Sequence, residues 1–540
     1  MSKGDINLDT ICPLTVASAL ARAAASAPDV EAIVANDERI TYDRLAMDVA
    51  VIRKGLHAQG VRKGDHVGLC LGNCVRWVAT FLALGSLGAI TVPINTRFVA
   101  SEMAYALGQS QVKILITCDR FLKVDFIALL RQICAGIDKV LPDAALPFLG
   151  KVIVIGTNIP AGTVSWDEMI QSGMDSGSLE PATVGPDDPL LIQYTSGTTS
   201  FPKGVLLTHR NMLANAYFSG LRMGLRPADR FHSARPFFHV AGTTLSILSA
   251  LQHMTTLVSM DRFEPGEALR LMEAEKCTHF SGNDTMALML LNHPDLPARK
   301  LALRGAWLAA SSTIIRRVID ELGARECVVG YGLSEASPNV AQSCFWEAEK
   351  IRVSAAMRIQ SGIHVRIRTA DGNEAATGQP GEILVRGWNI MQGYFNKPVE
   401  TAAALDANGW LSTGDLGQCD SAGRLTFLGR VKDIVRVGGE NVSPADVENV
   451  LHRNPAIRQA AVVGVPDERL VEVTAAFVIL NDGATATADA IMQWSKGEMA
   501  GFKVPRHIWI VDSFETIGMT ASAKIQKKQL AEHARTLLGL

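Results

Sequence analysis

The chain has 540 residues, more than one hydrophobic core usually accommodates, so we expect at least two domains. Its hydrophobic fraction of 48% and charged fraction of 20% are ordinary for a globular protein. A formal net charge of −2 argues against a protein that binds nucleic acid or an anionic membrane surface.

The N-terminal segment MSKGDINLDTICPL contains acidic residues and no long apolar run, so it lacks the pattern of a secretory signal. The nine cysteines are scattered, which predicts reduced thiols and a cytoplasmic protein. Residues 78–94 carry no charge but are too short and too rich in Gly for a comfortable membrane span. We predict a buried helix over 78–87, a buried strand over 89–94 and no integral membrane span.

Apolar runs typical of strands alternate with helical patterns in the first part of the chain, which predicts βαβ units around a parallel sheet. The predicted elements are strands over 67–71, 89–92 and 113–117 and helices from Cys74 and Ser101. Residues 155–190 are rich in Gly, Pro, Ser and Asp, and we interpret them as a surface connection.

The segment Tyr194–Gly204, YTSGTTSFPKG, follows an apolar run and is the most informative part of the sequence. Hydroxyls, glycine amides and the ammonium group of Lys203 suit the binding of a polyphosphate. Pro202 before the lysine and Gly204 after it differ from the P-loop, so a kinase or motor ATPase of that type is disfavoured. An ordinary Ser/Thr/Gly loop is the alternative.

This segment resembles the signature of the adenylate-forming superfamily, which includes acyl-CoA synthetases, peptide-synthetase adenylation domains and luciferases. Ser200 stands where the family usually has Gly. The resemblance implies that the phosphates of ATP contact Thr195, Ser196, Gly197, Thr198, Thr199 and Lys203. Thr208 is expected to cap the next helix, whose predicted apolar face consists of Met212, Leu213, Ala216, Tyr217, Gly220 and Leu221.

Pro236–Gly242, PFFHVAG, resembles the family motif at the acyl pocket. Amino-acid-activating members have Asp there, whereas this chain has Phe238 and His239, so an amine-bearing substrate would lack its counter-charge. The resemblance therefore implies an apolar carboxylic acid, either a medium- or long-chain fatty acid or a cyclic or aromatic acid. The expected pocket residues are Phe237, Phe238, His239 and Gly330, although a packed aromatic cluster explains Phe237 equally well.

Tyr331–Glu335, YGLSE, resembles the family's YGxTE and implies that Ser334 contacts the α-phosphate and that Glu335 binds Mg²⁺. Its partial match to the nucleophile elbow of hydrolases lacks the final Gly, which disfavours a serine hydrolase. The adenine is expected to lie against Ser311, Tyr331 and Gly332, with Tyr331 as the stacking ring. Residues 308–311, LAAS, depart from the usual Gly-rich run there.

Short strands such as 365–368 and 382–386 predict a β-rich subdomain. Beyond them, further motifs resemble those of the family. Asp415 and Arg430 would contact the ribose, Lys432 would be the hinge, and Gly438 and Gly439 would line the CoA tunnel. Ser443, Pro444 and Asp446 predict a capped helix start. TASAK ends on Lys524, which would reach the α-phosphate and the attacking carboxylate; Ala523 stands where the family has Gly and is strained if φ is positive.

We therefore predict an α/β protein with a large N-terminal domain of parallel α/β sheets over 1–430. This domain includes a small β-barrel subdomain at about 350–430, and a small mobile C-terminal α+β domain follows over 431–540, with its hinge at Lys432. The resemblance implies an ATP-dependent carboxylate–CoA ligase that uses Mg²⁺, with Lys524, Thr195, Glu335 and Lys203 as catalytic residues. Two alternatives remain: an acyl-AMP ligase that loads a carrier protein, and a catalytically impaired nucleotide-binding homologue. A homodimer is suggested by the family alone.

Overall fold

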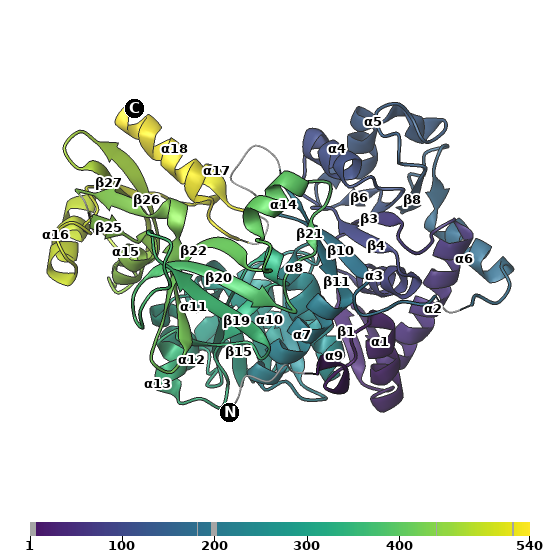
Figure 1. Cartoon of the computed structure of the whole chain (residues 1–540), viewed down its shortest axis with the longest axis horizontal. Coiled ribbons are helices and arrows are strands. Elements are labelled where there is room, and N and C mark those ends of the chain that lie inside the picture. The colour runs from purple at the N-terminus through teal and green to yellow at the C-terminus, as the bar shows by residue number, and fades with distance from the viewer. Residues whose placement is uncertain (1–6, 181, 196–201, 439, 521–522) are drawn as a thin grey trace.

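The computed structural model describes residues 7–180, 182–195, 202–438, 440–520 and 523–540. Two large sheets, one of 13 strands and one of 8, lie in the N-terminal part, and a sheet of 5 strands forms the core of the C-terminal part. In Figure 1 the C-terminal residues, coloured yellow-green to yellow, form a separate lobe beside the larger N-terminal part. The mixed α/β class expected from the sequence is confirmed.

The 13-stranded sheet contains a run of parallel strands in the spatial order β16-β15-β14-β12-β13-β1, with β2 antiparallel at the edge. Most residues of these parallel strands are buried, as expected when helices cover both faces. The strands are β1 (Glu31–Ala35), β2 (Glu38–Thr41), β12 (Arg230–Ser233), β13 (Thr256–Ser259), β14 (His279–Asn283), β15 (Gly305–Ala309) and β16 (Val328–Gly332). The helices are α1 (Val16–Ser26), α2 (Tyr42–Ala58), α7 (His209–Met223), α8 (Val240–Gly242), α9 (Ser249–His253), α10 (Pro265–Ala274), α11 (Asp284–Leu291), α12 (Ser312–Glu321) and α13 (Glu349–Val353).

The 8-stranded sheet has the order β21-β11-β10-β4-β3-β5-β8-β9, and its strands from β10 to β9 are parallel. It confirms the βαβ units predicted near the N-terminus. The strands are β3 (His66–Cys70), β4 (Ile90–Pro93), β5 (Ile114–Cys118), β8 (Lys151–Ile155), β9 (Val164–Ser165), β10 (Pro189–Tyr194), β11 (Gly204–Thr208) and β21 (Gly393–Tyr394), with a separate pair β6 (Arg120–Phe121) and β7 (Val124–Asp125). The helices are α3 (Val75–Leu87), α4 (Ala100–Gln109), α5 (Phe126–Ile133), α6 (Trp166–Asp175) and α14 (Pro398–Ala404).

The uncharged segment at 78–94 forms most of α3, followed by β4, as predicted. Cys74 is the N-cap of α3, and the described side chains of this helix are buried except that of Arg76. Gly88 ends the helix in the left-handed conformation at φ 72°, which favours glycine. No helix in the described ranges combines enough length with enough apolar character to cross a bilayer.

The prediction of a plain surface connection over 155–190 is wrong in part, because this segment contains β9 and α6. Ser165 and Glu168 form a reciprocal capping box at the start of α6. Gly173 of α6 lies so close to Gly55 of α2 that a Cβ would overlap the backbone. Because turn-forming residues dominate the composition of this segment, neither β9 nor α6 was predicted from the sequence.

Helix α7 is capped by Thr208 as predicted, but its predicted apolar face is wrong in part. Leu221 is 42% exposed, whereas Asn215, Ser219 and Arg222 are buried. The helix contacts elements on several sides, and Asn215 donates from Nδ2 to the Asn339 carbonyl at 2.9 Å. Tertiary contacts therefore bury polar positions that a single apolar stripe cannot predict.

The β-rich subdomain extends the 13-stranded sheet by antiparallel pairing from β16. Its strands follow the open order β17-β18-β23-β22-β20-β19, so the expected small barrel is not closed by any strand pair among the described residues. Pairing of β19 with β20 confirms the two predicted strands. The bounds are β17 (Asn339–Gln342), β18 (Met357–Ile359), β19 (Ile363–Arg368), β20 (Gly381–Gly387), β22 (Leu411–Cys419) and β23 (Arg424–Arg430).

The C-terminal part contains a hairpin, formed by β24 and β25, and two long antiparallel strands, β26 and β27. Ser443 precedes α15 as expected, but its hydroxyl makes no cap; it donates to the Leu428 carbonyl of β23 at 2.6 Å. The elements are β24 (Val435–Val437), β25 (Glu440–Val442), β26 (Ile457–Asp467), β27 (Val471–Leu480), β28 (His507–Ile510), α15 (Pro444–Leu451), α16 (Ala488–Glu498), α17 (Glu515–Gly518) and α18 (Lys527–Leu538).

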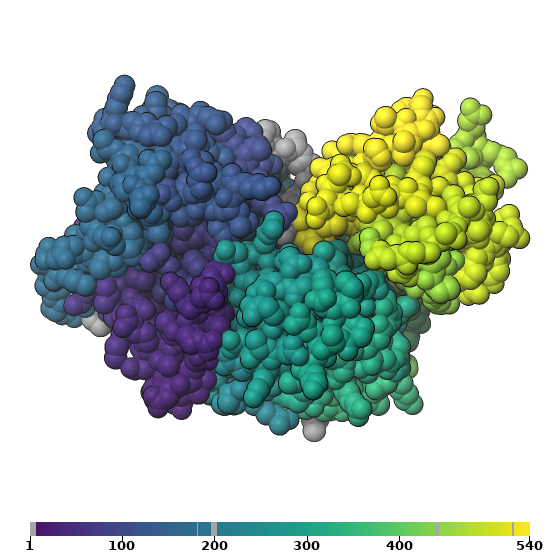
Figure 2. Space-filling view, turned by 180° about the vertical axis from the view of Figure 1, so that it is seen from behind, coloured from purple at the N-terminus to yellow at the C-terminus, as the bar shows by residue number. Residues whose placement is uncertain are grey.

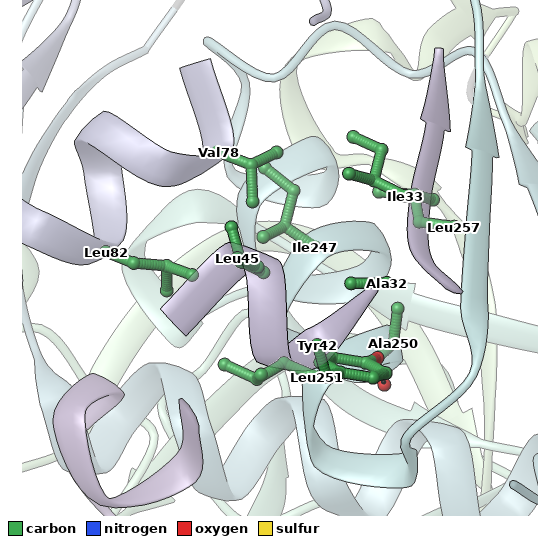
Figure 3. A pocket seen from close by; sticks show the side chains of 10 residues that line it. All are labelled: Ala32, Ile33, Tyr42, Leu45, Val78, Leu82, Ile247, Ala250, Leu251 and Leu257. Atoms are coloured by element: carbon green, nitrogen blue, oxygen red, sulfur yellow. Dashed lines mark hydrogen bonds between the residues drawn. The ribbon is translucent and has the colours of Figure 1, made fainter. Parts of the chain in front are cut away.

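A void of about 10 Å³ lies in the N-terminal core, between α2, α3, β1 and the segment 247–257 (Figure 3). Its lining is apolar except for the Tyr42 hydroxyl, which donates to the Ala250 and Thr255 carbonyls at 2.9 and 2.7 Å. A volume of this size holds at most one water molecule, so the void is a packing defect and not a ligand site.

Candidate active site

The parallel strands of the 13-stranded sheet end at one edge, and residues able to do chemistry follow several of those ends. Arg235 follows β12, Asp284 follows β14, Ser311 follows β15, and Ser334 and Glu335 follow β16. Open α/β sheets bind their ligands at such carboxyl ends. The edge is therefore a candidate active site.

The C-terminal domain contacts this edge. Gln459 of β26 donates from Nε2 to the Thr285 hydroxyl at the start of α11, at 3.4 Å. Figure 2 shows a hollow between the yellow C-terminal domain and the blue part of the chain. Residues from both domains can therefore meet a ligand in one cleft.

Asp415 of β22 is a buried carboxylate, 3% exposed, that faces this edge. Tyr331 donates its hydroxyl to Asp415 Oδ2 at 2.8 Å, and Arg430 Nε lies 3.4 Å from Oδ1. Burial raises the pKa of Asp415, an effect that Arg430 and Tyr331 oppose. Among the described residues, Oδ1 is a buried oxygen with no hydrogen-bond partner of acceptable geometry, an acceptor left unsatisfied beside the cleft.

The ring of Tyr331 is stacked on that of Phe427, with centroids 5.2 Å apart and planes inclined by 22°. Gly332, the last residue of β16, lies against the Pro338 carbonyl, where a Cβ would overlap the backbone. Ser311 is the N-cap of α12, and its hydroxyl accepts a weak bond from the Ile314 N–H at 3.5 Å. These three predicted nucleotide residues therefore lie at the ends of the neighbouring strands β15 and β16.

Glu335, Tyr394 and Lys203 form a second group. Tyr394 donates its hydroxyl to Glu335 Oε1 at 2.8 Å, and Lys203 Nζ lies 4.6 Å from the centroid of the Tyr394 ring. Thr195 donates its N–H to the Lys203 carbonyl at 3.1 Å, which joins the two ends of the predicted phosphate loop. Ser196, Gly197, Thr198 and Thr199, within that loop, lie outside the described residues.

Lys524 extends from a tight turn into the cleft. The Thr520 N–H donates to the Lys524 carbonyl at 2.8 Å, and the Lys524 N–H donates to the Thr520 hydroxyl at 3.0 Å. Ala523, between them, has φ +55°, the left-handed conformation that strains a residue with a Cβ. The backbone at Ala523 is therefore strained, as expected for an alanine with positive φ.

The ammonium of Lys524 is accessible to solvent but surrounded by protein atoms of the cleft walls. Partial desolvation lowers its pKa, and Arg430 lowers it further, whereas Asp284 and Asp415 act in the opposite direction. One cation of the C-terminal domain thus interacts with carboxylates from the helix α11 and the strand β22 of the N-terminal domain.

His239 lies in the same cleft and is neutral at pH 7. Desolvation, followed by the charges of Arg235 and Lys524, lowers its pKa to about 4. Its Nδ1 accepts the Ala241 N–H at 3.1 Å, so the proton of the neutral ring is on Nε2. His239 therefore presents an N–H donor.

Two predicted pocket residues, Phe237 and Gly330, pack against tryptophan side chains. Phe237 is 0% exposed, lies 5.6 Å from Trp77 between ring centroids, and is therefore a core residue that we do not retain as a pocket wall. Gly330 makes room for the Trp307 ring, which a Cβ would overlap. Phe238 remains partly exposed.

The predicted hinge and CoA residues lie in and before the β24–β25 hairpin. Lys432 is exposed, and Gly438 has φ +57°, a conformation that favours glycine. Gly438 borders a cavity of about 270 Å³ whose lining includes Arg469, Phe502 and Arg506. Gly439 lies outside the described residues.

Sequence reasoning missed two residues of the cleft, Arg235 and Tyr394. Arg235 lies just after the strand β12, a position that could have selected it. Tyr394 comes into position because β21 pairs with β11, which starts next to Lys203. No local pattern in the sequence predicts the pairing of β21 with β11.

Comparison with protein families gives two matches. Residues 20–395 match the family described as AMP-binding enzyme, and residues 446–524 match the AMP-binding enzyme C-terminal domain.

Known proteins similar to the chain agree with these matches. One is "3-[(3aS,4S,7aS)-7a-methyl-1,5-dioxo-octahydro-1H-inden-4-yl]propanoyl:CoA ligase" of Mycobacterium tuberculosis, 35% identical over 96% of this chain and 98% of that protein. Another is "Medium-chain acyl-CoA ligase ACSF2, mitochondrial" of Bos taurus, 32% identical over 97% and 88%. The crystal structure of the anthranilate CoA ligase AuaEII in complex with anthranoyl-AMP is 25% identical, with a TM-score of 0.88 over 98% of this chain and 99% of that one.

Proposed function

The chain belongs to the AMP-binding enzyme family of adenylate-forming acyl-CoA ligases, and from that premise we propose that it activates a carboxylic acid with a largely apolar body. The similar proteins act, by their names, on medium-chain, bicyclic and aromatic acids. Phe238 is consistent with an apolar pocket, and a fatty or cyclic or aromatic acid fits this description.

The observation that supports the proposal best is the convergence on one cleft of Lys524 from the C-terminal domain and Asp415 from the N-terminal domain. The charge of each affects the pKa of the other. An enzyme that joins a carboxylate to a nucleotide needs a cation beside the reacting groups and an acceptor for the nucleotide hydroxyls. Both are present, and they come from different domains.

In the first half-reaction, an oxygen of the substrate carboxylate attacks the α-phosphorus of ATP. The bond from that phosphorus to the oxygen bridging to the β-phosphate breaks, and pyrophosphate leaves with the bonding electrons. Lys524 offsets the negative charge that develops on the phosphoryl oxygens, and Lys203 with Thr195 and the loop 196–199 binds the departing phosphates. The product is an acyl adenylate.

The nucleotide is held by residues at the strand ends. Asp415 Oδ1, which lacks a protein donor among the described residues, accepts from a ribose hydroxyl, and Arg430 is the second ribose contact. Ser334 contacts the α-phosphate, and Ser311, Tyr331 and Gly332 lie beside the adenine.

Glu335 fits a magnesium ion, since Mg²⁺ takes one or two carboxylates and completes its shell from phosphate and water. Its Oε1 already accepts the Tyr394 hydroxyl, which orients the carboxylate. When bound, the ion would neutralise part of the phosphate charge.

In the second half-reaction, the thiol sulfur of CoA attacks the acyl carbon, and AMP leaves with the electrons of the acyl–phosphate bond. We propose that residues 431–540 rotate about Lys432 between the two steps. This rotation would withdraw Lys524 and bring Gly438 and Gly439 to the cleft. The cavity beside Gly438 contains Arg469 and Arg506, cations suited to a phosphate-bearing thiol.

The test is pyrophosphate release from ATP and Mg²⁺ with a panel of acids, each with and without CoA. We expect acid-dependent release that CoA stimulates. Lys524→Ala should reduce it roughly 10²–10³-fold, the usual cost of one electrostatic donor. Lys528→Ala is the matched control, because Lys528 is 65% exposed and its nearest carboxylate is Glu532, on its own helix.

Release that is indifferent to CoA would favour transfer to a carrier protein instead. ATP binding without release from any acid would indicate a catalytically impaired homologue. Equal losses of pyrophosphate release in Lys524→Ala and Lys528→Ala would contradict the proposed role of Lys524. The cytoplasmic location and the homodimer remain predictions.

A further inference from the structure

Arg235 is a guanidinium in the cleft, and no carboxylate of the described residues forms an ion pair with it. Its Nε donates to the Ser281 hydroxyl at 2.9 Å, and its Nη2 donates to the Gly282 carbonyl at 2.6 Å. Its guanidinium carbon lies 4.4 Å from the centroid of the Trp307 ring. These contacts hold one edge and one face of the group and leave the Nη1 end without a protein acceptor among the described residues.

Two buried arginines, Arg222 and Arg352, show the hydrogen bonding of a purely structural guanidinium in this protein. Arg222 donates three hydrogen bonds to backbone carbonyls, those of Gln342, Arg358 and Ile359. Arg352 also donates three, all to carbonyls. Arg235 has a single carbonyl partner and is partly exposed to the cleft. Its Nη1 makes no hydrogen bond within the described residues and is not fully buried. This nitrogen is therefore accessible to a ligand.

Two further N–H donors, those of Trp307 and His239, lie near Arg235. Trp307, 4% exposed, has an Nε1–H that finds no acceptor in the described part of the chain. His239 presents its Nε2–H, and its pKa is lowered by both Arg235 and Lys524. His239 thus lies within reach of two cations, one at the reacting end of the cleft and one anchored on β14.

We propose that the acid substrate has a second oxygen group, a carboxylate or a ketone remote from the reacting carboxylate, and that Arg235 binds it. A guanidinium whose Nη1 end is open suits an acceptor oxygen, and a carboxylate would also neutralise the uncompensated charge. Burial lowers the pKa of Arg235, and an anionic ligand would oppose this effect by stabilising the cation. This inference rests on the proposed function and narrows its substrate class.

The experiment compares three acids of equal chain length: octanoate, 7-oxooctanoate and suberate. Pyrophosphate release is measured with the wild-type enzyme, Arg235→Met, Arg235→Lys and, as a matched control, Arg366→Met. Arg366 is stacked on Trp410 at 4.4 Å in the same way but is 53% exposed.

We expect the wild type to have a higher kcat/KM for one of the oxygen-bearing acids than for octanoate. Arg235→Met should lower that value by at least about 30-fold for suberate, or about 10-fold for the ketone, and leave octanoate within about 3-fold. Arg235→Lys should recover part of the loss for suberate, because it retains the charge without the fork. Arg366→Met should behave as wild type. The better of the two acids identifies the group as carboxylate or ketone.

A wild-type preference for octanoate would overturn the inference and leave the proposed function intact, and this result requires no variant to fold. Equal losses on all three acids in Arg235→Met, with an unchanged KM for ATP and unchanged melting temperature, would also overturn it. In that case Arg235 acts on the reacting carboxylate. Release from none of these acids but from others would reject the inference alone, whereas release from no acid would reject the proposed function as well.

Discussion

At the scale of single residues, neighbours from other elements set the protonation state of the groups in the cleft. Desolvation raises the pKa of Asp415, lowers that of Lys524 and lowers that of His239 to about 4. Each shift disfavours the charged form, as expected when protein replaces water. ATP, a strongly negative ligand, would reverse this effect for Lys524.

Tyr394→Phe tests the group formed with Glu335 and Lys203. The variant removes the hydroxyl bond to Glu335 and retains the ring 4.6 Å from Lys203. We expect a higher Mg²⁺ concentration for half-maximal pyrophosphate release, with a loss of unfolding free energy of only about 0.5–1.5 kcal/mol. Tyr105→Phe is a control hydroxyl variant, since Tyr105 donates to the Pro202 carbonyl and not to Glu335. An unchanged Mg²⁺ requirement would separate Tyr394 from the ion.

At the scale of elements, the site depends on where strands and turns end. The parallel strands β12, β14, β15 and β16 present their carboxyl ends on one edge, and the turn at 520–524 presents Lys524 from the other domain. This turn contains Ala523 in the left-handed conformation, partly buried against the N-terminal core. Ala523 therefore has a strained backbone and also contacts the N-terminal domain.

Ala523→Gly should stabilise the turn. The left-handed conformation destabilises a non-glycine residue by roughly 1–2 kcal/mol. Glycine avoids this strain but loses more chain entropy on folding, which offsets about 0.5–1 kcal/mol of the gain. We expect a net gain of about 0.5 kcal/mol in unfolding free energy and a pyrophosphate-release rate that changes little. Ala523→Val, which adds β-branching at φ +55°, should be less stable than the wild type. Urea denaturation of both variants checks the order Gly, Ala, Val, and any other order would contradict the strain.

At the scale of the whole molecule, folding buries several neutral histidines. His209, His232 and His279 are 0% exposed and His253 is 9% exposed. Burial lowers the pKa of each from 6.5 to about 4. Below pH 6.5 the unfolded chain takes up protons at these positions that the native protein does not.

The protein should therefore lose stability as the pH falls from 6.5 to 4, and retain this contribution in full above 6.5. At 1.36 kcal/mol per pH unit for each proton, four histidines give a slope of about 5 kcal/mol per pH unit near pH 5. Urea midpoints between pH 4 and 7.5 measure it. His232→Leu is the matched variant, because burial alone shifts the pKa of His232, and it should reduce the slope near pH 5 by about 1.2 kcal/mol per pH unit. A slope unchanged in His232→Leu would contradict this origin.

The sequence by itself determined the α/β class, the main strands and helices near the N-terminus, and the membership of the AMP-binding enzyme family. Helix caps such as Thr208 and apolar runs such as β3–β5 are local signals, written in neighbouring residues. The motifs around Asp415 and Lys524 were recognisable because each is a short segment that resembles a motif of the family.

Only the tertiary structure decided which side chains meet. Tyr394 reaches Glu335 through a pairing of β21 with β11, and Arg235 lies against Trp307 because β12, β14 and β15 are neighbours in the sheet. Phe237 looked like a pocket wall and is a core residue, while Ser443 looked like a cap and bonds the neighbouring domain. These outcomes depend on contacts between residues distant in the chain, and burial and partner choice are properties of the packed molecule, not of any local pattern.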